Sequence, residues 1–264
     1  MNKKKILPII IFILLFLGMA YFSYIPITII GSLFNISNND FNMIMHSIYN
    51  GLSSMMNLFN ISFDSFMLFI KTMYMFIMDL LFIIVLFFVY KDKLIKDFKN
   101  YFKKFGENFE KSFKYYFIGV LIMMISNLII ALFIQGANAN NEEAVRNMID
   151  SVPLYMLFSV SIYAPFVEEL IFRHSIKNCI MCYGDNKLTR FIYIFTSGFI
   201  FAILHIIGVA TGYLDYVYLI PYMSLGIAFS ALYSKTDNIF SSISMHCLHN
   251  TFTIVLYLMV GGVI

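Results

Sequence analysis

The sequence predicts an all-α protein, a polytopic bundle of about seven transmembrane helices with its N-terminus in the cytoplasm. Three observations predict this fold class. Of the 264 residues, 60% are hydrophobic and only 12% are charged, whereas about 25% of residues are charged in a soluble domain. Several apolar runs reach the roughly 20 residues that a helix needs to cross a bilayer. Lysines and arginines gather in alternate segments between these runs.

The first apolar run, Ile6–Ile30, follows a basic N-terminal segment, Met1–Lys5. A cleaved signal peptide has a shorter apolar core that ends at a small-residue cleavage site. Hydrophobicity here continues past the only poor candidate, Gly18-Met19-Ala20. We therefore expect a first span rather than a signal peptide. The next segment, Gly31–Ser65, has apolar residues at helical spacing, which predicts an uncharged amphipathic helix at the outer interface.

Phe66–Tyr90 is expected to be the second span, and the segment after it, Lys91–Lys114, carries eight lysines. Its apolar residues fall along one face, which predicts a basic amphipathic surface helix suited to an anionic inner leaflet. The positive-inside rule alone also accounts for its charge. These features divide the chain into an N-terminal part, residues 1–114, and a helical core, residues 115–264.

Five further spans are expected in the core: Tyr115–Gln135, Val152 to about Tyr183, Phe191–Gly208, Tyr216–Ser234 and Ile239–Val260. Seven spans with a cytoplasmic N-terminus place every basic segment in the cytoplasm. The net charge of +3 is thus explained by topology and does not indicate a nucleic-acid partner. The expected setting is the cell membrane, and the wealth of Asn, Lys, Ile and Phe indicates an AT-rich, bacterial source.

Two adjacent carboxylates, Glu168 and Glu169, lie inside the apolar fourth span. Ionised groups at this depth are costly and persist where they pair, line a wet cavity or perform chemistry. Arg173 is four residues after Glu169 and can pair with it on one helical face. Glu168 is rotated by about 100°. The two carboxylates therefore meet different environments, which favours different roles.

Two later spans carry the other polar groups. His205 follows Phe201 by four residues near the end of the fifth span, and His246 and Asn250 are four apart on the last one. Ser242 extends this polar stripe, which must face the interior of the bundle. Three helices thus each offer one polar face to a shared site.

Glu168-Glu169-Leu-Ile-Phe-Arg173, Phe201-Ala-Ile-Leu-His205 and His246-Cys-Leu-His-Asn250 occur in this order. In order and separation they resemble the motifs of the CPBP intramembrane proteases, which include the type II CAAX prenyl endopeptidase and bacterial Abi-type proteins. The resemblance covers roughly residues 115–260.

This resemblance implies an intramembrane glutamic endopeptidase that needs no metal or other cofactor and acts on a membrane peptide or protein. Glu168 would be the general base and would activate a water together with His205. His246 and Asn250 would stabilise the tetrahedral oxyanion. Glu169 and Arg173 would organise the site. A desolvated glutamate is a competent base near neutral pH, and donors aimed at an oxyanion can each contribute about 3 kcal/mol.

Two alternatives stay open. Glu168, His205 and His246 could supply three zinc ligands with an open position, although no His-Glu-x-x-His motif is present. A non-proteolytic role, in bacteriocin self-immunity or as a scaffold for another membrane enzyme, is the other. The substrate and the oligomeric state cannot be predicted from the sequence.

The depth of the site gives one structural expectation. His205 lies about 21 Å along a helix from Phe191, at 1.5 Å per residue. Glu168 reaches this level only if the fourth helix continues to about Tyr183, tilted or kinked at Pro165. A long fourth helix that contains His174 and Lys177 is therefore predicted. Cys179 and Cys182 are expected to be packing residues rather than a redox or metal pair.

Overall fold

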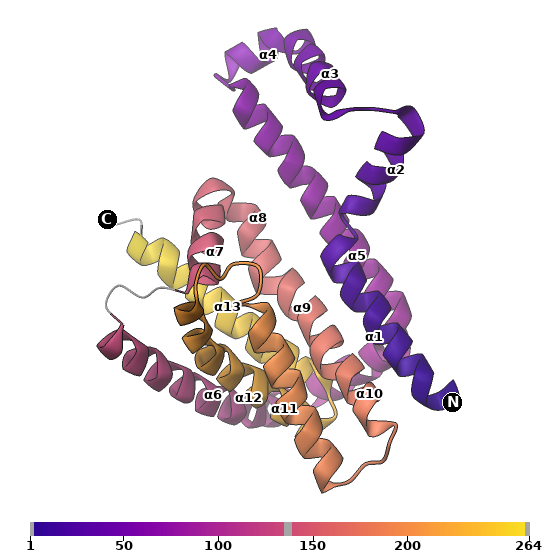
Figure 1. The fold of residues 1–264 in the computed structure, drawn as a ribbon, viewed down its shortest axis with the longest axis vertical. Helices are drawn as coiled ribbons and strands as arrows, with labels where there is room; N and C mark the ends of the chain where they lie inside the picture. The colour runs from indigo at the N-terminus through magenta and orange to yellow at the C-terminus, as the bar shows by residue number, and fades with distance from the viewer. Residues whose placement is uncertain (1–2, 135–138, 262–264) are drawn as a thin grey trace. The chain divides into compact units, whose positions relative to one another are not determined.

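The computed structural model describes residues 3–134 and 139–261, and all regular structure within these ranges is helical (Figure 1). Residues 135–138, at the end of the predicted third span and just after it, lie outside the described residues, as do the first two residues of the basic N-terminal segment. The chain forms two compact units. One comprises Leu17–Ile84, and the other comprises Met1–Phe16 together with Val85–Ile264. The division at residue 114 stays a prediction.

The expected number of spans is confirmed. Six helices in the described ranges are long and apolar enough to cross a membrane, and the number rises to seven if a bent pair near the N-terminus is one span. That pair corrects the prediction of a simple span over Ile6–Ile30. The structure has α1, Lys3–Tyr21, and α2, Tyr24–Phe34, bent by 70° at the break between them. Pro26 fits the break, because it lies in the first turn of α2 and has no N–H to donate to the Phe22 carbonyl oxygen four residues earlier. The cytoplasmic orientation of the N-terminus stays a prediction.

The smaller unit contains the predicted interfacial segment. It forms α3, Asn38–Gly51, and α4, Ser53–Leu58. Ser37 begins α3 with a capping box, in which its side chain and the Asp40 carboxylate satisfy each other's backbone N–H. The apolar side of this segment packs on the start of α5, where Met45, Met56 and Phe66 form a buried cluster.

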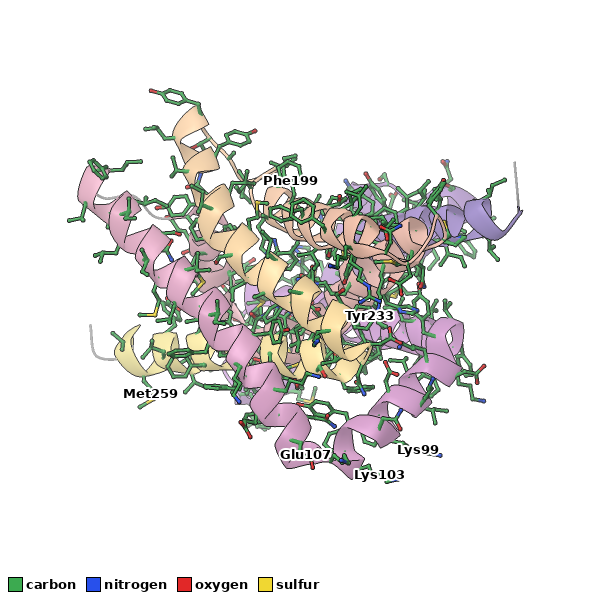
Figure 2. The ribbon with its side chains drawn as sticks, turned by 90° about the horizontal axis from the view of Figure 1, so that it is seen from below. Lys99, Lys103, Glu107, Phe199, Tyr233 and Met259 are labelled. Atoms are coloured by element: carbon green, nitrogen blue, oxygen red, sulfur yellow. The ribbon has the colours of Figure 1, made fainter. Side chains whose placement is uncertain are left out.

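The structure has α5 over Phe63–Lys103 and α6 over Phe105–Phe133. Tyr90 has non-helical backbone angles inside α5, φ −116° and ψ 20°, so a kink separates the second span from the basic stretch where the sequence predicts it. The predicted surface helix over Lys91–Lys114 is wrong in its second half, because the basic stretch is divided at Lys104. Figure 2 shows Lys103 and Glu107 on the two sides of this turn.

Part of that basic stretch is buried. Leu94 and Tyr101 are 3% and 1% exposed, and the Asp97 carboxylate accepts a hydrogen bond of 2.8 Å from the Ile239 backbone N–H. Asp97 also pairs with Lys93, whose Nζ lies 3.1 Å away. The end of α5 therefore anchors the start of the last helix in addition to carrying positive charge.

The core of the larger unit is a bundle in which α12, Leu219–Thr236, packs between α6 and α11, Lys187–Leu204 (Figure 1). The crossing of α11 and α12 is close because Gly198 faces Gly226: a Cβ added at Gly198 would lie 2.9 Å from the Ile227 backbone nitrogen. Small residues allow helices to approach in this way in membranes. The last helix, α13, covers Ile239–Gly261.

The prediction of a long fourth helix is confirmed. A continuous helical span runs over Pro153–Met181, and it contains both His174 and Lys177. Its segments are α8 (Pro153–Phe158), η1 (Ser159–Tyr163), α9 (Ala164–Glu168), η2 (Glu169–Ser175) and α10 (Ile176–Met181). Both η1 and η2 are π-helical. Such turns are rare and occur frequently at functional sites. In the chain, the short helix α7, Asn140–Ser151, comes between α6 and this fourth helix.

Candidate functional site

The two adjacent glutamates stand where α9 ends and the π-helical η2 begins. Glu168 is the last residue of α9 and Glu169 the first of η2. The Glu169 side chain is completely buried, whereas 20% of the Glu168 side chain is exposed. The predicted difference in environment between the two carboxylates is therefore present.

Arg173 is the partner of Glu169, as their spacing predicts. Its Nε lies 3.2 Å from Oε2 of Glu169, and both side chains are fully buried. The guanidinium group also lies over the rings of Phe201 and Phe229, 4.5 and 5.8 Å from their centroids. Aromatic faces attract a cation, so these rings help to retain a fully buried guanidinium.

His246 joins the two glutamates. Its Nδ1 lies 2.9 Å from Oε1 of Glu169, and its Nε2 lies 3.8 Å from Oε2 of Glu168. Phe229 is stacked on the imidazole ring at 5.2 Å between centroids. The proton position is inferred from these contacts: Nδ1–H donates to Glu169, and Nε2 is the nitrogen turned toward Glu168.

This contact between His246 and Glu169 was missed by the sequence reasoning, which paired Glu169 with Arg173 alone. The signal was present in part. A polar stripe on an apolar helix must meet polar groups of the bundle, but periodicity alone cannot choose between Glu168 and Glu169 as the partner. The four groups form an ionic cluster, which comprises Glu168, Glu169, Arg173 and His246.

His205 ends α11 as its C-cap residue. Its Nδ1 lies 2.7 Å from the carbonyl oxygen of Phe201, so Nδ1 carries a proton and Nε2 is left with its lone pair. The imidazole ring also stacks on Tyr222 at 4.9 Å. Phe201 contacts both His205 and His246, with ring centroids 4.4 and 5.7 Å away. The action of His205 together with Glu168 stays a prediction.

Asn250 lies one turn after His246 on α13 and reaches the other π-helical segment. Its Nδ2 donates to the carbonyl oxygen of Val160 at 2.8 Å. An amide nitrogen has two hydrogens, so this bond leaves one donor for another acceptor. The structure thus gives Asn250 a structural contact, and its role toward an oxyanion stays a prediction.

Two serine hydroxyls on α11 and α12 form hydrogen bonds that lead to the second π-helical segment, η2. No sequence motif indicated these bonds. Ser230 on α12 donates to Ser197 on α11 at 2.8 Å, and Ser197 donates to the carbonyl oxygen of Phe172 at 2.7 Å. Phe172 directly precedes Arg173. All three residues are almost fully buried, so this relay positions the backbone that carries the guanidinium.

His174 and His249 are not motif residues, and each has a tyrosine hydroxyl as its partner. His174 Nδ1 lies 2.7 Å from the hydroxyl of Tyr233, a residue that Figure 2 labels on α12. His249 lies 3.4 Å from the hydroxyl of Tyr116. The Cys182 thiol donates to the Cys179 carbonyl oxygen at 3.1 Å, which is a local contact within one helix end.

The proposed zinc ligands do not form a metal site. Within residues 3–134 and 139–261, no three His, Cys, Asp or Glu side chains are gathered closely enough to hold a metal ion. Glu168 and His246 are neighbours, but His205 bonds to its own helix and stacks on Tyr222. The geometry therefore does not favour the zinc alternative.

Fold and site together define a multi-pass integral membrane protein with an ionic cluster inside its helical bundle. Comparison with known families narrows this class. Residues 150–252 match the family model described as type II CAAX prenyl endopeptidase Rce1-like. Over this segment the chain is similar to the type II CAAX prenyl endopeptidases, in agreement with the resemblance of its motifs.

Two curated relatives have peptidase or protease names. The chain is 31% identical over 155 residues to the putative membrane peptidase YdiL of Bacillus subtilis, which covers 53% of this chain and 58% of that protein. It is 26% identical over 150 residues to the membrane-embedded CAAX protease MroQ of Staphylococcus aureus, covering 54% and 57%. The UPF0177 protein YvdC of Lactococcus lactis is 24% identical over 145 residues, covering 53% and 51%. The chain thus matches little more than half the length of these relatives. No solved structure matches it significantly.

Proposed function

We propose that this chain is an intramembrane endopeptidase that hydrolyses a peptide bond of a membrane-associated peptide or protein. The observation that carries this proposal is the placement of His246 between two carboxylates of different exposure, 2.9 Å from Glu169 and 3.8 Å from Glu168. The family match and the names of the curated relatives support a membrane protease. The residue roles in this mechanism are those that the motif resemblance implies.

Glu168 is the base in this proposal. It is the only acidic member of the ionic cluster with solvent access, since 20% of its side chain is exposed while Glu169 is fully buried and engaged by Arg173 and His246. Its carboxylate takes a proton from a water molecule as the water oxygen bonds to the carbonyl carbon of the substrate. A positioned base of this kind contributes about 10²–10⁴-fold to the rate.

His205 is proposed to help orient this water. The hydrogen bond from its Nδ1 to the Phe201 carbonyl oxygen leaves Nε2 as an acceptor, which is the tautomer that can accept a hydrogen bond from water. Tyr222 stacks on the ring and limits its rotation.

His246 and Asn250 are the proposed donors to the oxyanion. Because Nδ1 of His246 donates to Glu169, its Nε2–H is available toward the reaction space when the ring is protonated. Asn250 offers the amide hydrogen that Val160 does not use. When the tetrahedral intermediate collapses, the carbon–nitrogen bond breaks and the proton held by Glu168 goes to the leaving amine.

Glu169 and Arg173 hold the reacting groups in place. The guanidinium balances the buried carboxylate, and the carboxylate fixes the orientation of His246. These two residues are therefore positioning residues with no direct contact to the substrate.

The experiment compares the membrane peptides of bacterial cells that express the wild type with those of cells that express Glu168→Gln, using quantitative mass spectrometry of new peptide termini. Candidate substrates are then cleaved by the purified full chain in nanodiscs, with and without a chelator. The matched control is Glu110→Gln, since the Glu110 side chain is 70% exposed and pairs with Lys114 on its own helix.

The proposal predicts cleavage by the wild type and by Glu110→Gln, a loss of at least about 100-fold in Glu168→Gln, and no effect of the chelator. Cleavage that survives in Glu168→Gln would contradict the assigned base. Loss of cleavage with the chelator and recovery with zinc would favour a metallohydrolase. A cell phenotype that Glu168→Gln leaves intact would favour a non-proteolytic role in immunity or scaffolding.

A further inference from the structure

At the end of the π-helical segment η2, a backbone hydrogen bond is moved away from Phe172. The Ile176 N–H bonds to the carbonyl oxygen of Arg173, whereas in an α-helix it would bond to that of Phe172, four residues earlier. The Phe172 carbonyl oxygen thus loses its α-helical donor. Because a buried carbonyl without a donor is unfavourable, another group must supply the hydrogen bond.

Ser197 on α11 supplies this bond. Its hydroxyl donates to the Phe172 carbonyl oxygen at 2.7 Å, and Ser230 on α12 donates to the Ser197 oxygen at 2.8 Å. Both serines are 0% exposed, so bulk water cannot act as a substitute donor. Without the Ser197 hydroxyl, the carbonyl regains a partner when the Ile176 N–H returns to it, which is the α-helical arrangement.

Tyr90 supports the same segment from α5. Its hydroxyl lies 2.6 Å from Oγ of Ser175, and Ser175 donates to the Leu170 carbonyl oxygen at 3.0 Å. Since Ser175 has only one hydroxyl proton and gives it to Leu170, Tyr90 is the donor between the two hydroxyls. The bond from Ser175 spans five residues, as the backbone bonds of a π-helix do. Tyr90 lies at the kink of α5, so the kinked residue itself contacts η2.

The segment between these two hydroxyls carries the buried ion pair of the site. Glu169 is the first residue of η2, and Arg173 lies inside it. A π-helical turn holds one residue more than an α-helical turn. Loss of that extra residue from the turn would rotate the helix before it by about 100° relative to the helix after it. Glu169 would then no longer point to His246, whose Nδ1 lies 2.9 Å from its carboxylate.

We propose that Tyr90 and Ser197 are positioning residues of the peptidase site, which hold η2 in its π-helical form and thereby keep Glu169 directed at His246. This assignment rests on the proposed function, since it concerns the same ionic cluster. Both residues act through η2, and neither has to touch the substrate. Their effect on the pair formed by Glu169 and His246 can be measured without cleavage.

The test compares Ser197→Ala, Tyr90→Phe and the double variant with two matched controls, all as the full chain in nanodiscs. Ser112→Ala removes another fully buried serine hydroxyl, which donates to a carbonyl oxygen of its own helix at 2.7 Å. Tyr74→Phe removes another tyrosine hydroxyl of α5, which donates to the Ser23 carbonyl oxygen. Neither control hydroxyl bonds to η2.

The first readout is solid-state NMR of the chain labelled with 15N-histidine, in which the His246 signals are assigned by their loss in His246→Gln. The wild type and both controls should show the signal of a hydrogen-bonded Nδ1–H. The double variant should lose this signal while circular dichroism still shows a folded helical protein. An unchanged His246 signal in the double variant would overturn the proposal, whatever the activity.

The second readout is kcat per folded molecule, with the folded fraction measured by circular dichroism. Each single variant should lower kcat about fivefold, the effect of one lost hydrogen bond. The double variant should lower kcat about 10²-fold with little change in KM, as expected for misplaced reacting groups. Both controls should keep the wild-type kcat.

A wild-type kcat in the double variant would overturn the positioning role while leaving the peptidase proposal intact. Loss of the His246 signal in Ser112→Ala as well would also overturn it, because general destabilisation and not the contact with η2 would then move the histidine. If the wild type cleaves none of the candidate substrates, the proposed function fails, and the His246 signal still decides whether Tyr90 and Ser197 hold Glu169 in place.

Discussion

His246 and Glu169 form a hydrogen-bonded pair across the bundle, with Nδ1 of the imidazole 2.9 Å from Oε1 of the carboxylate. The two residues are 77 positions apart in the chain and only 4% and 0% exposed. The same carboxylate pairs with Arg173 through its other oxygen. Glu169 thus joins α13 to the fourth helix and balances a buried cation, which gives it a structural importance that Glu168 lacks.

Glu169→Gln should therefore unfold the protein more easily than Glu168→Gln. Removing one partner of a buried ion pair leaves the other charge uncompensated, at a cost of about 3–5 kcal/mol. The Glu168 side chain is 20% exposed, so water can compensate for its loss. Thermal unfolding in detergent, followed by circular dichroism, measures the difference. An equal loss of stability in both variants would contradict the distinction between the two glutamates.

Gly198→Ala should also destabilise the bundle. The new Cβ would lie 2.7 Å from Cγ1 of Ile227 and 2.9 Å from its backbone nitrogen, so α11 and α12 must move apart. Overpacking of this kind costs about 1–3 kcal/mol. The control is Gly106→Ala, because nothing lies within 4 Å of its Cβ position and alanine favours helix. If Gly198→Ala and Gly106→Ala shifted the unfolding midpoint in the same direction, the crossing of α11 and α12 would tolerate a methyl group.

The sequence was sufficient to predict the spans after the first, because the roughly 20 apolar residues of a span are set by the thickness of the bilayer. It also predicted the pairing of Glu169 with Arg173, since both lie on one helix and their spacing fixes the geometry. The long fourth helix followed from the need to bring Glu168 to the depth of a site on another span. These predictions depend on one helix at a time or on the thickness of the membrane.

The features that were missed depend on contacts between helices. Neither the bond between His246 and Glu169 nor the serine relay from Ser230 to Phe172 can be derived from periodicity, because helix rotation and register are set by packing. The division of the basic segment at Lys104 was missed for another reason. Positive charge marks the side of the membrane but does not show where one helix ends.

The Asp237 carboxylate should make the stability of the protein depend on pH in the acidic range. Its carboxylate lies in the turn before α13, outside the spans, and burial alone would raise its pKa. Hydrogen bonds and charges from Lys177 and Lys93 outweigh this effect, so its pKa is lowered from the ordinary value of 3.8. A lowered pKa contributes stability that is present above the ordinary value and lost as the pH falls through the lowered one.

Asp237→Asn removes the titrating carboxylate. Asparagine tolerates the left-handed backbone of this position, φ 50°, so the substitution changes charge without strain. We expect the wild type to be more stable than the variant at pH 6, and the difference to shrink below about pH 4. Unfolding midpoints across this range provide the measurement. A difference that stays constant from pH 6 to pH 3 would assign the effect to something other than this carboxylate.

Substitutions at Asn250 can distinguish a structural role of this residue from a catalytic one. Asn250→Ala removes the bond to the Val160 carbonyl oxygen, 2.8 Å long, and leaves a carbonyl of η1 without this donor, at a cost of about 1–3 kcal/mol. If the second amide hydrogen also meets the oxyanion, kcat should fall by about 10²–10³-fold with little change in KM. Asn250→Asp keeps the shape of the side chain but supplies no amide hydrogen, so it should lose kcat to a similar extent.

The control for Asn250 is Thr253→Val, which removes the hydroxyl that donates to the Asn250 carbonyl oxygen and leaves the amide side chain in place. This variant should keep kcat within about a factor of three, because an exposed hydrogen bond contributes little. A fall in stability without a fall in kcat for Asn250→Ala would confine the residue to its contact with η1. The oxyanion would then depend on His246, whose Nε2 is the other donor turned toward Glu168.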